Sequence, residues 1–87
     1  MKIDQKDIPQ IVKSFWKAEF PEDELKDCFF LNKDKDNSNE WGALVFECKS
    51  EKNKIYIAVH TIKEQHFARK LTEDEINYLL FGTIPIN

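Results

Sequence analysis

Glycine and proline are scarce in this chain of 87 residues, which contains only two Gly and three Pro. Phosphate-binding loops need several closely spaced glycines so that the backbone can approach the phosphate. Gly42 and Gly82 stand far apart, so the sequence contains no loop of this kind. With 41% hydrophobic and 33% charged residues, the composition is that of a folded protein and predicts one globular domain over residues 1–87.

The chain also lacks the excess of positive charge that binds nucleic acid. It has 13 Lys and Arg, of which Arg69 is the single arginine, against 16 Asp and Glu, and its net charge is −3. Proteins that bind phosphates gather basic residues on one face, whereas here the lysines are interspersed with acids. We therefore expect no direct binding of nucleic acid.

Long hydrophobic runs are absent from the sequence. None approaches the roughly twenty apolar residues that a membrane-spanning helix needs, and the first ten residues do not contain the apolar segment of a signal peptide. We expect a cytoplasmic protein that is not bound to membranes. In that compartment the two Cys are expected to be free thiols.

Apolar residues at helical spacing predict two helices. The first has one apolar stripe, formed by Ile8, Ile11, Val12, Phe15 and Trp16. It is expected to end at Phe20, because the residue before a proline avoids the helical conformation. The second helix is predicted over 73–81, since Thr72 and Glu75 have the spacing of a capping box.

Stretches rich in β-branched and aromatic residues predict strands over 28–31, 41–48 and 54–62. The segment 66–71 is either a fourth strand or an extension of the third. The resulting order is α-β-β-β-(β)-α. We therefore predict a small single domain of the α+β class, with an antiparallel sheet and both helices packed on one face.

The turns suggest a register that divides the strand residues between two faces, since side chains alternate along a strand. A turn near residue 51 pairs Cys48 with Ile55, and the 32–40 loop pairs Cys28 with Leu44. One face is then wholly apolar and is the predicted core: Cys28, Phe30, Leu44, Phe46, Cys48, Ile55, Ile57 and Val59. In this register the two cysteines lie roughly 13 Å apart, beyond disulfide reach.

The second face of the predicted sheet is also too apolar to be left in water. It carries Phe29, Leu31, Trp41, Ala43, Val45, Glu47, Tyr56, Ala58, His60 and Ile62. The C-terminal segment, a second copy of the chain or another protein could cover it. Aromatic residues are enriched at protein interfaces, so this face is also a candidate interaction surface.

The leading functional hypothesis is a small non-enzymatic protein-binding module. The predicted anchors of its interface are Phe29, Trp41, Tyr56, His60 and Ile62. The acids Glu22, Asp23 and Glu24 are predicted to attract a partner with a basic surface and to raise the association rate. A bacterial immunity protein or a phage-encoded inhibitor that covers a toxin or host protein fits this size and charge. The alternative is a structural homodimer that buries the second face at its own interface.

Oxygen-bearing side chains are concentrated in the loop Asn32–Gly42, which raises the question of a metal or catalytic site. An EF-hand calcium loop needs Gly at its sixth position and Glu at its twelfth. Counted from Asp34, these positions are Asn39 and Val45, and a start at Asp36 fails as well. The loop is hydrophilic, whereas acid–base catalysis by a carboxyl group needs a dry pocket. We interpret it as a solvated turn.

Histidine and cysteine are too few and too widely spaced for a convincing metal site. Structural zinc sites use close pairs of ligands, but the nearest pair here, His60 and His66, is six residues apart. The predicted register also places His60 on the opposite face from Cys28 and Cys48. We therefore predict no metal, no cofactor and no catalytic residue.

The predicted order of elements resembles that of the double-stranded-RNA-binding domain. That family binds phosphates with lysines at the start of its final helix, where this chain has Thr72 to Glu75, with three acids. The resemblance therefore extends to the fold and not to RNA binding. The segment "RKLTEDEINYLLFGT" (69–83) is also similar to a strand-turn-helix stretch in accessory domains of bacterial topoisomerases, from which no function is carried over.

Overall fold

A computed structural model describes residues 2–31 and 43–81 of the chain. Its five strands form one antiparallel sheet in chain order: β1 (Lys2–Ile3), β2 (Asp27–Phe30), β3 (Ala43–Lys49), β4 (Lys54–Ile62) and β5 (Gln65–Lys70). The helices are the short 3-10 helix η1 (Gln5–Asp7), α1 (Gln10–Glu19) and α3 (Glu73–Phe81). The predicted α+β class and antiparallel sheet are confirmed, and 66–71 corresponds to a separate strand.

Helix α1 packs over the larger of the two buried clusters. Val12 and Trp16 of its predicted stripe are buried, and Ile8 is buried just before the helix begins. The Trp16 ring contacts Phe20, with 4.6 Å between ring centroids. The strand residues that form a buried cluster with Ile8, Val12 and Trp16 are Cys28, Phe46, Cys48, Ile55, Ile57 and Val59. These all belong to the face predicted as the core.

The strand register agrees with the sequence prediction in one hairpin and differs in the other. Cys48 pairs with Ile55, as predicted. Cys28, however, pairs with Cys48 and not with Leu44. The sequence does not locate the centre of the loop between β2 and β3. The observed register of β2 on β3 therefore differs from the predicted one by four residues. Because four is an even number, each side chain still points to the predicted face.

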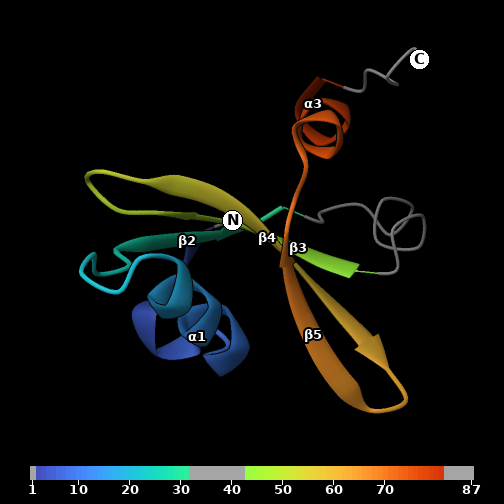
Figure 1. Cartoon of the computed structure of the whole chain (residues 1–87), viewed down its shortest axis with the longest axis horizontal. Coiled ribbons are helices and arrows are strands. Elements are labelled where there is room, and N and C mark those ends of the chain that lie inside the picture. The colour runs from blue at the N-terminus through green and yellow to red at the C-terminus, as the bar shows by residue number, and fades with distance from the viewer. Residues whose placement is uncertain (1, 32–42, 82–87) are drawn as a thin grey trace.

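The two helices lie on opposite faces of the sheet, and Figure 1 shows α1 below the strands and α3 above them. A second buried cluster consists of Ala43, Val45, Tyr56, Ala58 and Leu71. Leu31 and two residues of α3, Ile76 and Leu79, pack against it. The prediction that both helices share one face is therefore wrong for α3. The sequence analysis named three candidates that could cover the second face: the C-terminal segment, a second copy of the chain and another protein. The position of α3 corresponds to the first of them.

The start of α3 has the predicted capping box. The backbone N–H of Glu75 donates to Thr72 Oγ1 at 3.2 Å, and the backbone N–H of Thr72 donates to Glu75 Oε1 at 3.0 Å. This reciprocal pair satisfies two donors that the first turn of a helix leaves without a helical acceptor. The helix occupies Glu73–Phe81, the range predicted from the sequence.

The hairpin formed by β4 and β5 is long, and its outer end projects away from the rest of the sheet (Figure 1). Ile62 pairs with Gln65, so the connection consists of Lys63 and Glu64 alone. Both residues have positive φ, at 50° and 67°. Two-residue hairpin loops with positive φ at both positions match the twist of the strands, although Asn and Gly adopt this conformation more readily than Lys and Glu.

Candidate protein-binding surface

Tyr56 lies in the interior of the second face, whereas the sequence analysis expected it at an interface. Its side chain is 6% exposed and belongs to the cluster that Ile76 and Leu79 pack against. Its hydroxyl donates to Glu47 Oε2 at 2.8 Å. Burial and the neighbouring carboxylate together raise the pKa of Tyr56 to about 12. Since part of α3 packs here, Tyr56 is not available to an outside partner.

Phe29 is half-buried on β2, on the same face as Tyr56. The Lys49 ammonium lies 5.0 Å from the centre of the Phe29 ring, within the range of a cation–π contact. One side of the ring is therefore used within the molecule. The exposed remainder is small for an anchor, so Phe29 suits the rim of an interface better than its centre.

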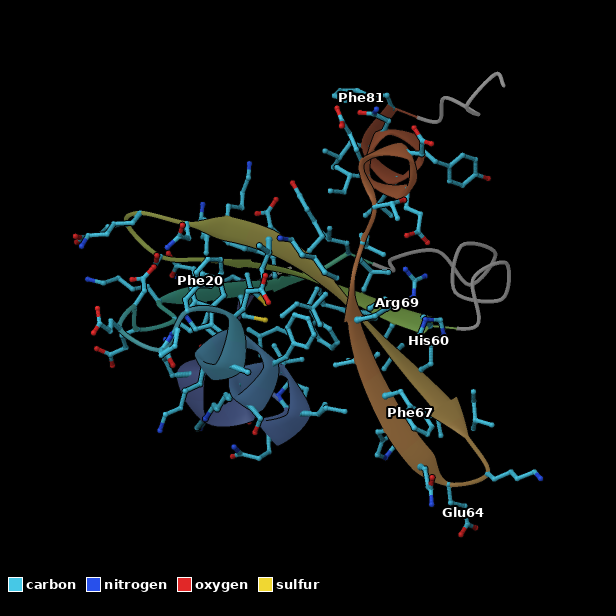
Figure 2. The ribbon with its side chains drawn as sticks, viewed as in Figure 1. Phe20, His60, Glu64, Phe67, Arg69 and Phe81 are labelled. Carbon is cyan, nitrogen blue, oxygen red and sulfur yellow. The ribbon has the colours of Figure 1, made fainter. Side chains whose placement is uncertain are left out.

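His60 belongs to a polar group that connects β4, β5 and α3. Its Nε2 accepts a hydrogen bond from Arg69 Nε at 2.9 Å. Arg69 also forms two parallel bonds of 2.7 Å to the Glu75 carboxylate. Because arginine only donates, His60 Nε2 is the acceptor in this bond. His60 thus helps to place Arg69 at the start of α3 (Figure 2).

The Arg69–Glu75 pair is the strongest electrostatic feature among the described residues. The Arg69 guanidinium, together with the Thr72 hydrogen bonds, lowers the pKa of Glu75 from 4.5 to about 2, even though partial burial acts in the opposite direction. The same contact raises the pKa of Arg69. The pair holds the first turn of α3 against the end of β5, so we assign it a structural role.

Ile62 is the predicted anchor that remains well exposed. Its side chain is 58% accessible near the tip of the β4–β5 hairpin. Phe67, on the facing strand, is 49% accessible, and Figure 2 shows it on this projecting hairpin. Both residues point to the second face, because His60 pairs with Phe67 and side chains alternate. Together they form an exposed apolar patch beyond the buried cluster.

The opposite face of the same hairpin is also apolar. A hollow of about 170 Å³ lies between the start of α1 and the hairpin. Its lining includes Pro9, Ile11 and the exposed Leu44. Thr61 and His66 stand at this hollow and share a hydrogen bond of 2.8 Å across the two strands. The projecting end of the hairpin therefore offers apolar contact area on both faces.

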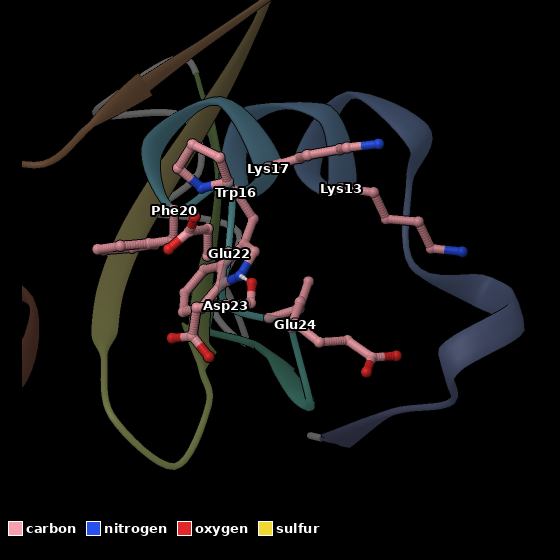
Figure 3. Close-up of a pocket in the computed structure, with 9 residues that line it drawn as sticks. Lys13, Trp16, Lys17, Phe20, Glu22, Asp23 and Glu24 are labelled. Carbon is pink, nitrogen blue, oxygen red and sulfur yellow. Dashed lines mark hydrogen bonds between the residues drawn. The ribbon is translucent and has the colours of Figure 1, made fainter.

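The three predicted acids lie in the turn that follows α1, beside a hollow of about 320 Å³ (Figure 3). Glu22 and Glu24 are exposed. Asp23 is used within the fold, because its carboxylate accepts hydrogen bonds from Ser50 at 2.5 Å and from Asn53 at 2.7 Å. These two donors lower the pKa of Asp23. Of the three predicted acids, Glu22 and Glu24 are therefore the ones available to a basic partner.

The hollow next to these acids is lined by both charged and apolar side chains, with Lys13 and Lys17 on its α1 side. Trp16, Phe20 and Pro21 form its apolar wall. The indole N–H of Trp16 donates to the backbone oxygen of Asp23 at 2.7 Å, so this donor is already satisfied. Specific small-molecule sites have a few polar groups that converge on the ligand. The Trp16 hydrogen bond and the contact of its ring with Phe20 instead connect α1 to the following turn.

Trp41 lies outside the described residues, as does the whole of the acidic loop Asn32–Gly42. The functional role predicted for Trp41 therefore stays a prediction. Over residues 2–31 and 43–81, no three His, Cys, Asp or Glu side chains stand close enough to hold a metal ion. In the same ranges, no helix is long and apolar enough to cross a membrane.

Phe67 and Leu44 were missed as surface residues by the sequence analysis. Leu44 alternates correctly into the core face, but it lines the open hollow beside the start of α1 and stays exposed. Alternation alone cannot show how far a helix covers the sheet. Phe67 was in a segment whose pairing was left open. The signal that could have found it is the Ile62-to-Gln65 spacing of a tight hairpin, which places Phe67 opposite His60.

Comparisons with known proteins do not assign this chain to a group. No known family matches it, and neither a curated protein nor a solved structure is significantly similar to it.

Proposed function

We propose that this chain is a small non-enzymatic protein-binding module that contacts its partner through the outer end of the β4–β5 hairpin. One observation carries the proposal: Ile62 and Phe67 are both exposed on the same face of a hairpin that projects away from the rest of the sheet. Adjacent exposed apolar side chains of this size, surrounded by polar residues, are typical of protein interaction sites. Aromatic and aliphatic anchors of this kind provide most of the energy of a small interface.

The geometry of β5 supports the same location. β5 is an edge strand of the sheet, so its outward backbone groups can pair with an extended segment of another protein. Lys63 and Glu64, which form the turn next to the apolar pair, are exposed and carry both signs of charge. A polar rim around an apolar centre is the usual organisation of an interface. Glu22 and Glu24 lie elsewhere, beside the end of α1, where they would act on the approach of a basic partner.

The biological roles we propose rest on the size and charge of the chain and are compatible with this surface. An immunity protein or a phage-encoded inhibitor acts by covering a functional surface of another protein, and a projecting hairpin can enter a concave site. Such a function needs no catalytic group in the binding protein. The side chains that carry it would be Ile62 and Phe67, with His60 and Arg69 fixing the base of the hairpin through their hydrogen bond.

The test is capture of proteins from a bacterial extract with the wild-type chain and with the double variant Ile62→Ser and Phe67→Ser. For a protein that the wild type captures, we expect the captured amount to be at least tenfold lower with the double variant. Tenfold corresponds to about 1.4 kcal/mol, which is less than one buried apolar side chain contributes to an interface. Equal capture by both proteins would contradict the proposed location.

A matched control variant distinguishes a specific loss from a general loss of surface hydrophobicity. Leu80 and Phe81, at the end of α3, are 46% and 72% exposed and lie far from the hairpin (Figure 2). The variant Leu80→Ser and Phe81→Ser removes a similar apolar area. We expect it to capture the same protein as the wild type. Urea unfolding of both variants confirms that they remain folded.

The alternative is a structural homodimer in which the edge strands of two copies pair, and the edge position of β5 is the observation that favours it. Light scattering after size exclusion separates the two hypotheses. A monomer mass at all concentrations contradicts the homodimer, whereas a dimer that Phe67→Ser converts to a monomer supports it. The captured protein would then be a second copy of the chain.

A further inference from the structure

The two cysteines are cross-strand neighbours in the centre of the core. Cys28 of β2 stands directly opposite Cys48 of β3, and their sulfur atoms are 3.8 Å apart. Both are free thiols. The sequence prediction of free, buried thiols agrees with this, but the predicted separation of roughly 13 Å is wrong, because the register of β2 on β3 differs by four residues.

The hydrogen-bond pattern shows which kind of pair the cysteines form. The backbone N–H of Leu31 donates to the Val45 oxygen at 3.0 Å, which marks this as a hydrogen-bonded position of the ladder. Bonded and non-bonded pairs alternate along antiparallel strands. Counted back by three residue pairs from Leu31 and Val45, Cys28 and Cys48 form a non-hydrogen-bonded pair. In such a pair the two Cα atoms lie about 4.5 Å apart. That distance is inside the range of roughly 4.4–6.8 Å found for disulfides.

The position of the pair also decides what can react with it. Both side chains are fully buried, beneath Val12 and Trp16 of α1. A bulky disulfide such as oxidised glutathione cannot approach the sulfur atoms without unfolding of this part of the core. A hydroperoxide has the size of a small solvent molecule and can reach buried groups through brief local openings.

The two thiols are chemically unequal. Either thiol can donate in the contact between the two sulfur atoms. With Cys48 as the donor, the contact lowers the pKa of Cys28 and raises that of Cys48, and burial adds to the rise at Cys48. The thiolate is the nucleophilic form of cysteine. Cys28 is therefore the sulfur expected to react first, and Cys48 is the neighbour that holds a proton.

We propose that Cys28 and Cys48 form a peroxide-sensitive dithiol that closes to an intramolecular disulfide. In the first step the Cys28 thiolate attacks one oxygen of hydrogen peroxide, the O–O bond breaks, and a sulfenic acid and hydroxide form. In the second step the Cys48 sulfur attacks the Cys28 sulfur, the S–O bond breaks and water leaves with the Cys48 proton. Overall, two thiols and one peroxide give one disulfide and two water molecules.

The short distance determines the outcome of this chemistry. A sulfenic acid that has no neighbouring thiol is oxidised further to a sulfinic acid, which cellular thiols do not reduce. Here the second sulfur is in contact from the start, so ring closure outruns a second encounter with peroxide. The bridge would join β2 to β3 across the loop between them, and a dithiol reductant would reopen it.

The experiment measures thiols and mass after oxidation. The full chain is treated with hydrogen peroxide, the excess is destroyed with catalase, and the protein is denatured and alkylated. Untreated protein is expected to take up two alkyl groups. Treated protein is expected to take up none, to be lighter by two hydrogen atoms, and to recover both thiols with dithiothreitol. Peptide mapping assigns the bridge to Cys28 and Cys48 and separates it from oxidation of Met1.

Two controls keep the result interpretable. The variant Cys48→Ala retains the reactive sulfur alone, and we expect it to gain one or two oxygen atoms at Cys28. Wild-type chain unfolded in urea retains both cysteines without their contact, so it remains informative if the variant does not fold. The ratio of bridged to oxygenated product should be at least about tenfold higher for the folded than for the unfolded wild type.

Three outcomes would overturn the proposal. The first is that both thiols of the folded protein still react with the alkylating agent after peroxide has oxygenated Cys28 in the variant. The second is that the wild type accumulates sulfinic acid to the same extent as Cys48→Ala. The third is disulfide-linked dimers in place of an internal bridge on a non-reducing gel.

Discussion

The two faces of the sheet are held to their helices by different forces. On one face, α1 buries Val12 and the large ring of Trp16 among nine clustered apolar residues. On the other face, α3 has no buried side chain and covers a cluster of mostly small residues with the half-buried Ile76 and Leu79. Its first turn is fixed instead by Arg69 and Glu75. Apolar burial thus dominates at α1, and charge pairing contributes more at α3.

This difference predicts different sensitivities for the two halves of the fold. Energy from burial is insensitive to pH and large per side chain. Energy from a partly exposed ion pair is smaller and depends on ionisation and salt. We therefore expect α1 to unfold only with the whole domain, while α3 can separate locally.

The largest expected effect is that of Trp16→Ala on the α1 face. It removes the largest fully buried side chain among the described residues, the contact with Phe20 and the hydrogen bond to Asp23. We expect a loss of about 3–5 kcal/mol in the free energy of unfolding, measured by urea titration. That is a large share of the stability of a domain of this size.

The matched variant on the other face is Leu79→Ala, which shortens a half-buried residue of α3. A loss of about 1 kcal/mol is expected, since less area is removed from water. If the two substitutions cost the same, the faces are equally packed and the comparison above is wrong.

An effect of the same size as that of Leu79→Ala is expected for Glu75→Gln. Glutamine can still cap the helix toward Thr72, so this variant removes mainly the charge that pairs with Arg69. Both side chains are partly exposed, and we expect a loss of about 1 kcal/mol at neutral pH after allowing for solvent screening. Urea titration gives the global stability, and hydrogen exchange in α3 shows whether the loss is local.

The pH dependence of this difference has a definite sign. The folded state lowers the pKa of Glu75 from 4.5 to about 2, so the unfolded chain takes up the proton first on acidification. The contribution is fully present above about pH 4.5 and is lost as the pH falls toward 2. The difference between wild type and Glu75→Gln should therefore shrink over this range. A constant difference would show that the charge is not responsible.

The smallest expected effect concerns the hairpin tip, which belongs to neither helix contact. Lys63 and Glu64 have positive φ, a conformation that Asn and Gly adopt at lower cost. The double variant Lys63→Asn and Glu64→Gly is expected to raise the free energy of unfolding by about 0.5 kcal/mol. Its pH profile should stay parallel to that of the wild type. A fall in stability would mean that contacts of the Lys63 and Glu64 side chains stabilise the fold by more than the positive-φ backbone costs.

The sequence predicted local elements well because their signals are local. The apolar stripe through Val12 and Trp16 indicated α1, the capping box at Thr72 and Glu75 indicated α3, and both are present in the structure. Alternation assigned Phe46 and Ile57 to one face and Tyr56 to the other. These inferences depend only on the period of the backbone, which neighbouring residues determine.

The candidate site was predicted less well, because exposure depends on distant parts of the chain. Tyr56 and Ile62 were equivalent by alternation, yet the structure buries the first and exposes the second. Ile76 and Leu79 of α3 pack against the cluster that contains Tyr56. The strand period places residues on a face, but the position and length of the covering helix decide which of them a partner can reach.

The amino-acid sequence alone determined the α+β class, the ends of α3, the pairing of Cys48 with Ile55 across the β3–β4 turn and the composition of each face. Tertiary structure decided that α3 lies opposite α1, that Cys28 meets Cys48, and that Ile62 and Phe67 project into solvent. The physical reason is the same in each case. Hydrogen-bond periodicity acts over a few residues, whereas the register across a long loop and the docking of a helix are set by packing between segments far apart in the chain.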